Sequence, residues 1–329
     1  MVNYEQILSA RVKEVQPSGI RRFFELAAKM PHAISLGVGE PDFETPWQIR
    51  RAGIQSLEKG QTFYTSNWGL AELRNQIAAL VRRKYRLCYD ADKEILVTVG
   101  GSEAIDNTIR AIVNVGDEVL IPEPSFVCYK PLTQMAGGVP VIIETKPENG
   151  FRLTAKELEE KITEKTKLLI LPYPNNPTGA VYSEESLRAL ADLAIKHDFF
   201  IIADEIYEKL VYDGSRHFSI ASISEEAFNH TCTINGFSKA YAMTGWRLGY
   251  VAARQDIIKG IMRFQSQVNS SNCSISQKAG VAALTGPQDS IAAMVEEFAR
   301  RKDYVYDRVC KIPHMSCPEP KGAFYVLCD

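Results

Sequence analysis

The sequence predicts an α/β fold in which a mainly parallel sheet is covered by helices on both faces. Between about residues 94 and 253, short runs of β-branched and apolar residues alternate with stretches of helical periodicity. Ligands bind at the carboxyl edge of such a sheet, so functional residues are expected where the strands end. The expected strands are Ile95–Val99, Glu118–Ile121, Val139–Glu144, Lys167–Leu171, Phe199–Ala203, Thr231–Ile234 and Leu248–Ala252.

Helical periodicity supplies the layers that cover this sheet. Between the strands it predicts helices over Glu103–Val113, Ala155–Ile162 and Glu184–His197. Before and after the alternating region it predicts helices over Gly19–Met30, Gln48–Lys59, Leu70–Arg86, Asp256–Gln267, Gln277–Leu284 and Ser290–Val309.

Composition excludes several classes of function. The 329 residues suggest about two domains, and 38 Lys and Arg against 40 Asp and Glu leave a formal charge of −2. A nucleic-acid or membrane-surface partner would need a basic excess, so neither is expected. No apolar run is long enough for a transmembrane helix, and the first ten residues do not resemble a signal peptide. Seven dispersed cysteines predict reduced thiols in a cytoplasmic protein, and the five histidines lack metal-ligand spacing.

The segment Asn235–Tyr250, NGFSKAYAMTGWRLGY, is the most informative part of the chain. Lys239 stands there among small and aromatic residues, and a lysine in a dry pocket has a lowered pKa and becomes a nucleophile. Eight residues later, Arg247 offers a guanidinium fork suited to a phosphate. Taken alone, Lys239 could equally be a surface lysine in a loop, and Arg247 could equally pair with a carboxylate.

As a whole, this segment resembles the lysine signature of class I/II pyridoxal-phosphate-dependent aminotransferases of the aspartate aminotransferase type. The resemblance extends in the expected order from Gly39 to Tyr325. It implies the fold type I of pyridoxal-phosphate (PLP) transferases, with a seven-stranded sheet, Lys239 linked to PLP and Arg247 on its phosphate. It also implies a large PLP-binding domain over residues 47–285 and a smaller α+β domain over residues 1–46 and 286–329.

Three further residues match positions around the PLP ring. Asp204 follows an apolar strand, where its carboxylate could pair with a protonated pyridine nitrogen and make the ring an electron sink. A strand-end aspartate is otherwise usually a cap or turn residue. The resemblance assigns Tyr207 and Asn176 as hydrogen-bond donors to the phenolate oxygen of the ring. Asn176 lies in PYPNNPTGAVY, whose prolines exclude a helix and would also suit plain rigidity.

Other matched residues concern the phosphate and the two faces of the ring. Gly101 and Ser102 open a helix whose N–H groups could face a phosphate, although turn glycines are common. Phe126 would stack on the pyridine ring, with core packing as the alternative. Tyr64 matches a tyrosine that reaches the phosphate of the neighbouring subunit, which implies a homodimer with shared active sites.

The substrate side of the site is also implied by the resemblance. Gly39 matches a glycine along the substrate, or is a simple loop glycine, and Asn176 and Phe126 would contact the substrate as well. The expected catalytic residues are Lys239, Asp204 and Tyr207, with Lys239 moving a proton between the substrate α-carbon and the cofactor.

The expected reaction moves an amino group from an L-amino acid, by family default aspartate or glutamate, to a 2-oxo acid in ping-pong order. A PLP-dependent C–S lyase of the same fold would use the same cofactor residues. Family members also continue beyond the element Gly322–Tyr325, where they carry an arginine for the substrate α-carboxylate, and no residue here matches it. We therefore expect a small domain that is truncated at its C-terminal end. A non-catalytic form that binds PLP or a full-length partner is the third interpretation.

Overall fold

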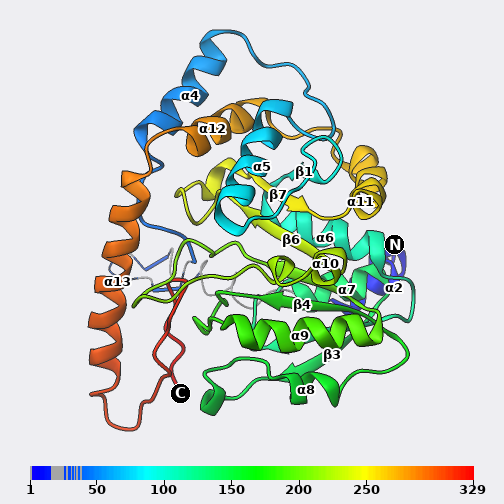
Figure 1. Ribbon diagram of the computed structural model, residues 1–329, viewed down its shortest axis with the longest axis vertical. Helices are drawn as coiled ribbons and strands as arrows, with labels where there is room; N and C mark the ends of the chain where they lie inside the picture. The colour runs from blue at the N-terminus through cyan, green and yellow to red at the C-terminus, as the bar shows by residue number, and fades with distance from the viewer. Residues whose placement is uncertain are drawn as a thin grey trace.

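A seven-stranded sheet forms the centre of the computed structural model, which describes residues 2–15, 26, 29, 30, 32, 34, 36, 37 and 39–329 (Figure 1). Its strand order is β1-β7-β6-β5-β4-β2-β3. The strands are β1 (Ile95–Thr98), β2 (Glu118–Glu123), β3 (Val139–Glu144), β4 (Thr166–Pro172), β5 (Phe200–Asp204), β6 (Thr231–Gly236) and β7 (Gly249–Ala252). All seven expected strands are therefore confirmed, with ends that differ by at most two residues.

One strand runs against the others. β7 pairs antiparallel with both β1 and β6, whereas β3, β2, β4, β5 and β6 pair in parallel. The parallel strands are almost wholly buried, as expected where helices cover both faces of a sheet. Because β7 is reversed, its first residue lies at the edge where the parallel strands end.

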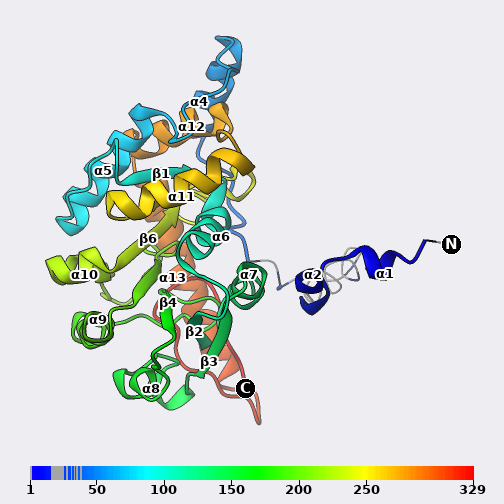
Figure 2. The same cartoon turned by 90° about the vertical axis from the view of Figure 1, so that its right-hand side faces the viewer.

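Helices cover both faces of the sheet (Figure 2). On one face, α6 (Gly100–Ile112), α7 (Tyr129–Ala136) and α11 (Gln255–Val268) bury apolar side chains such as Ile105, Ile109 and Ile258 against the strands. The other face is covered by α5 (Ala71–Tyr85), α8 (Ala155–Glu159), α9 (Glu184–His197), α10 (Glu225–Asn229) and α12 (Ser274–Thr285). Each face therefore has its own core, and together they hold the strand ends in place.

Among the described residues, four helices lie outside these layers. α1 (Tyr4–Ile7) and α2 (Ala10–Glu14) project from the body beside α7, α4 (Trp47–Glu58) packs on α12, and α13 (Asp289–Val309) runs along one side of the molecule. The chain after α13 returns to the segment that follows β5, where the N–H of Ala323 donates to the carbonyl of Leu210 at 2.9 Å. Phe324 packs there against Phe298 of α13.

Most helix predictions are confirmed, whereas four helices in the described part of the chain, α1, α2, α7 and α10, are not predicted by the sequence pattern. α9 begins and ends as expected, with Ser183 capping its N-terminus through the N–H of Ser186 at 3.2 Å. α7 was missed because Pro131 interrupts its pattern, yet a proline in the first turn lacks only an N–H that has no helical partner there. α10 is only five residues long. The helix expected over Gly19–Met30 lies mostly outside the described residues, and the domain division at residues 47 and 285 stays a prediction.

Within the described part of the chain, none of the helices combines the length and the apolar character that crossing a membrane requires.

Candidate active site

A cavity of about 560 Å³ lies at the carboxyl edge of the sheet. Its volume is within the range of small-molecule and cofactor sites. Nine of the ten residues predicted from the sequence line it: Gly39, Gly101, Ser102, Phe126, Asn176, Asp204, Tyr207, Lys239 and Arg247. Tyr64 does not line it, and its side chain is 91% exposed.

The sheet topology explains why residues so distant in sequence meet here. β5 ends at Asp204 itself, and β6 ends three residues before Lys239. The reversed β7 begins two residues after Arg247 at this same edge. The chain therefore leaves the sheet after β6 and returns into β7 within a short excursion that carries both the lysine and the arginine.

Asp204 is a buried carboxylate with hydrogen bonds on both oxygens. The hydroxyl of Tyr129 donates to Oδ2 at 2.7 Å, and the N–H of Ile206 approaches Oδ1 at 3.3 Å. Burial raises the pKa of Asp204 above its ordinary value, while the bond from Tyr129 and the charge of Lys239 act in the opposite direction. A cation placed in the cavity would favour the ionised form further.

Lys239 is held with its amine inside the cavity. Nζ donates to the carbonyl oxygen of Gly39 at 2.5 Å and lies 5.6 Å from the centre of the Tyr207 ring. Burial lowers the pKa of Lys239 to about 8; the nearby charge of Arg247 acts in the same direction, whereas Glu40 opposes it. An appreciable fraction of this amine is therefore neutral and nucleophilic near neutral pH.

Tyr207 connects the lysine to the opposite wall. Its hydroxyl lies 2.6 Å from that of Tyr325, and its ring meets the Tyr325 ring edge-on. Burial raises the pKa of Tyr207 well above its ordinary value, so its hydroxyl keeps its proton, and a hydrogen bond with Asn176 acts the other way. Tyr207 and Asn176 thus present donors to the same part of the cavity.

The arginine and the start of α6 form a second polar corner. Gly100 has a φ of +74°, and a Cβ on it would come within 2.6 Å of Arg247 Nη2. The absence of a side chain therefore lets the guanidinium lie directly over the helix start. Gly249 allows a similarly close approach, because its Cβ would lie 2.6 Å from the carbonyl carbon of Gly100. Free N–H groups, the positive end of the α6 dipole and a guanidinium together suit a phosphate.

Sequence reasoning missed several lining residues. Tyr129 bonds to Asp204, Tyr325 bonds to Tyr207, and Glu40 accepts a hydrogen bond from Thr244 at 3.0 Å. Tyr325 lies in the Gly322–Tyr325 element named above, and Tyr129 follows the predicted residue Phe126 by three residues. Their roles depend on contacts between distant segments, which local patterns do not encode.

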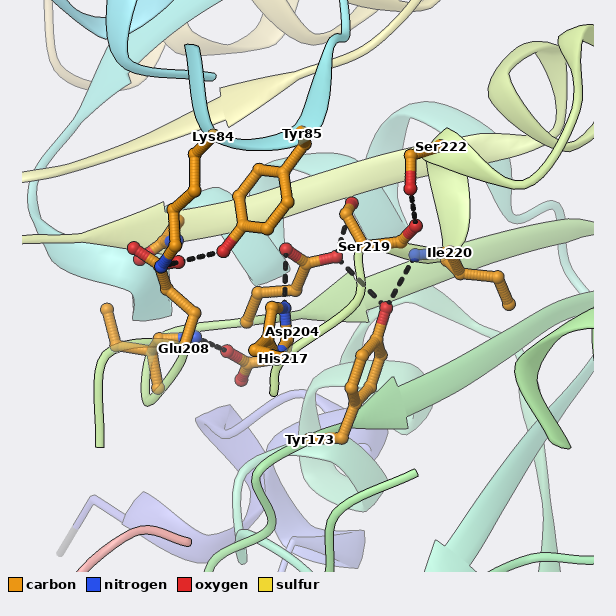
Figure 3. A network of polar contacts seen from close by, with 12 residues as sticks. Lys84, Tyr85, Tyr173, Asp204, Glu208, His217, Ser219, Ile220 and Ser222 are labelled. Atoms are coloured by element: carbon orange, nitrogen blue, oxygen red, sulfur yellow. Dashed lines mark hydrogen bonds and ion pairs between the residues drawn. The ribbon is translucent and has the colours of Figure 1, made fainter. Parts of the chain in front are cut away.

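A second polar network contains Tyr173, His217 and Ser219 (Figure 3), and all three contact the carboxylate of Glu205. Glu205 Oε1 accepts hydrogen bonds from Tyr173 at 3.0 Å and Ser219 at 2.7 Å, and Oε2 lies 3.0 Å from His217 Nε2. The His217 ring stacks on Tyr173 with ring centres 5.1 Å apart. Glu205 itself has no exposed surface, so this network joins β4, β5 and the loop before η2 (Ile220–Ser222) from inside.

The fold and this cavity define an enzyme of the aminotransferase class. A family model described as aminotransferase class I and II matches residues 31–329, and the chain therefore belongs to this family, whose members transfer amino groups between amino acids and 2-oxo acids.

Individual relatives carry more than one substrate name. The aspartate aminotransferase of Bacillus sp. (strain YM-2) is 42% identical over 329 residues, covering 99% of this chain and 84% of that protein. The aromatic-amino-acid aminotransferase 2 of Thermococcus litoralis is also 42% identical, over 97% of this chain and 82% of that protein. The structure of the aspartate aminotransferase from Rhizobium meliloti superposes with a TM-score of 0.94 at 38% identity, over 98% of this chain and 81% of that one.

Proposed function

We propose that the cavity binds pyridoxal 5′-phosphate and that the enzyme uses it to move an amino group from aspartate or glutamate to a 2-oxo acid. The observation that carries this proposal is the meeting of Lys239, Asp204 and Arg247 in one cavity at the carboxyl edge. An amine with a lowered pKa, a buried carboxylate and an anion-binding corner are the three groups that an aldehyde, a pyridine nitrogen and a phosphate require. When bound, the cofactor withdraws electrons from the substrate α-carbon.

The buried carboxylate of Asp204 would hold the pyridine nitrogen in its protonated form. Because Tyr129 donates to one of its oxygens at 2.7 Å, the orientation of the carboxylate is fixed before anything binds. A preorganised charge of this kind needs no rearrangement during the reaction. This supports its role as the residue that tunes the cofactor.

Lys239 would attach the cofactor and then serve as general acid and base. Its neutral amine is the nucleophile toward the aldehyde, and once released it can hold a proton taken from the substrate α-carbon. The contacts of Nζ with Gly39 on one side and the Tyr207 ring on the other keep the amine where a substrate would lie.

The remaining predicted residues would fix the position of the ligand. Arg247, Gly101 and Ser102 suit the phosphate, Tyr207 and Asn176 suit the phenolate oxygen, and Phe126 suits a ring face. Gly39, Asn176 and Phe126 also border the space that is left for the amino acid.

We also place Tyr64 in the active site of a second copy of the chain. Tyr64 and Phe63 are 91% and 83% exposed, and Trp47, Ile54 and Leu57 present further apolar surface on one side of α4. So much exposed apolar surface is unusual in a monomer, which supports a homodimer.

Absorption spectroscopy tests the attachment of the cofactor. The protein with bound PLP should show a visible band that Lys239→Ala lacks, while Lys84→Ala, a lysine outside the cavity, keeps it. A band that is unchanged in Lys239→Ala would exclude this lysine as the attachment point. Aspartate with 2-oxoglutarate should then yield oxaloacetate and glutamate. Release of ammonia from cystathionine, without this exchange, would instead indicate a lyase.

A further inference from the structure

Three cysteines lie together where the chain returns after α13. The neighbouring thiols of Cys310 and Cys328 both raise the pKa of the Cys317 thiol. Cys310 and Cys328 are exposed, whereas Cys317 is half-buried, and all three are free thiols. The cysteines are thus dispersed along the sequence, as noted above, but three of them are neighbours in the folded structure.

The backbone aligns two of these thiols face to face. The N–H of Ser316 donates to the carbonyl of Asp329 at 3.0 Å, and the N–H of Asp329 donates to the carbonyl of Ser316 at 2.8 Å. This reciprocal pair sets an antiparallel register in which Cys317 and Cys328 stand opposite each other as a non-hydrogen-bonded pair. In such a pair the side chains share one face and the Cα atoms are about 4.5 Å apart, within the range that a disulfide spans.

We propose that Cys317 and Cys328 form a reversible disulfide that fixes the segment carrying Tyr325 against the body of the enzyme. A bond between them closes a loop that contains the Gly322–Tyr325 element. That element is held by the Ala323 hydrogen bond to Leu210 and reaches the cavity through the contact of Tyr325 with Tyr207. The redox state of the two thiols would thus set how firmly one wall of the active site is held.

A low-molecular-weight disulfide, such as oxidised glutathione, is the oxidant. The thiolate of Cys328 attacks one of its sulfurs and releases one small thiol. Cys317 then attacks the sulfur of Cys328 and releases the second. Two protein thiols are oxidised and one small disulfide is reduced, so the balance needs no other reactant. Cys328 is the attacking thiol because it is exposed, whereas burial, together with the interaction with Cys310, raises the pKa of Cys317 to about 11.

Peptide mapping tests the pairing. The chain is equilibrated with oxidised glutathione, its remaining thiols are alkylated, and trypsin is added without reductant. Trypsin cuts after Lys311 and Lys321, which places the three cysteines on three different peptides. We expect the peptide Ile312–Lys321 to be linked to the peptide that begins at Gly322. Alkylation of both peptides, or a link from Cys317 to Cys310, would overturn the proposal.

Two variants and a second measurement complete the test. Cys88→Ser, which removes an exposed thiol elsewhere, should keep the cross-link, and Cys317→Ser should lose it. Hydrogen exchange in the peptide that begins at Gly322 should slow by about tenfold on oxidation, because local opening is restricted. Unchanged exchange in cross-linked protein would show that the disulfide does not hold the segment.

Discussion

Asp204 and Glu205 are consecutive buried carboxyl groups at the end of β5, yet their surroundings differ in kind. Asp204 lines the cavity and is held from one side by Tyr129. Glu205 lies inside the network of Tyr173, Ser219 and His217. Alternation along a strand places the two side chains on opposite sides, so one strand end provides both a functional group and its structural support. Burial alone thus does not identify a functional carboxylate, because only the one that borders a cavity can meet a ligand.

Asp204→Asn should have the largest effect on activity. An amide cannot carry the charge that keeps a pyridine nitrogen protonated, so we expect kcat to fall by about 10²–10³-fold. The free energy of unfolding should change little, because the amide still accepts a hydrogen bond from Tyr129. Steady-state kinetics and urea unfolding measure the two quantities. Loss of stability with retained activity would reverse the roles given to the two carboxyl groups.

Glu205→Ala should do the opposite. The change leaves the buried hydroxyls of Tyr173 and Ser219 without the oxygen that accepts their hydrogen bonds, so the free energy of unfolding should fall by about 3 kcal/mol. Folded protein should keep its affinity for PLP. Urea unfolding and cofactor titration separate the two effects, and a loss of PLP affinity in the folded variant would contradict the contrast.

Arg247→Lys tests the polar corner at the start of α6. A lysine keeps the charge but loses the guanidinium fork, so PLP affinity should weaken by about tenfold. Arg254→Lys is the matched control, because Arg254 lies outside the cavity at the far end of β7. Equal affinities of both variants, measured by fluorescence titration, would show that Arg247 does not bind the phosphate.

The pH dependence of cofactor attachment gives the mildest effect. Burial lowers the pKa of Lys239 to about 8, so its nucleophilic neutral form grows as pH rises through 8. The rate of attachment should therefore rise with pH and level off above about pH 9. Stopped-flow absorbance measures this rate, and a midpoint near the ordinary lysine value of about 10.4 would mean that the amine is not desolvated.

Shared active sites can be tested by mixing two variants. Tyr64→Ala and Lys239→Ala each remove one group from every site of a homodimer. In a mixed dimer, the site that retains Lys239 would receive an intact Tyr64 from the other chain. Activity should thus reappear on mixing, as measured by the transamination rate, and no recovery in proven mixed dimers would place Tyr64 outside the site.

Local patterns predicted the strands, and the resemblance to the aminotransferase lysine signature predicted most of the site. Lys239, Asp204 and Arg247 also stand close to strand ends, where the pattern leads one to expect functional groups. Tyr129 and Tyr325 could not be predicted, since their partners Asp204 and Tyr207 lie far away in the sequence. The single reversed strand was also not specified by pattern, because apolar runs carry no direction. The network of Glu205 could not be predicted for the same reason, because Tyr173, Ser219 and His217 come into contact with Glu205 only in the folded chain.

The reversed direction of β7 also determines where the chain can accept inserted residues without disturbing the site. The chain leaves the sheet at Gly236 and re-enters it at Gly249, so the backbone is anchored on both sides of the lysine and arginine. Inserting one residue between them would alter their separation at once, since both ends are pinned by neighbouring strands. An insertion at the opposite edge of the sheet, in the loop before β6, would leave that separation untouched. We therefore expect relatives to differ in loop length at that opposite edge, and to keep the same number of residues between Lys239 and Arg247.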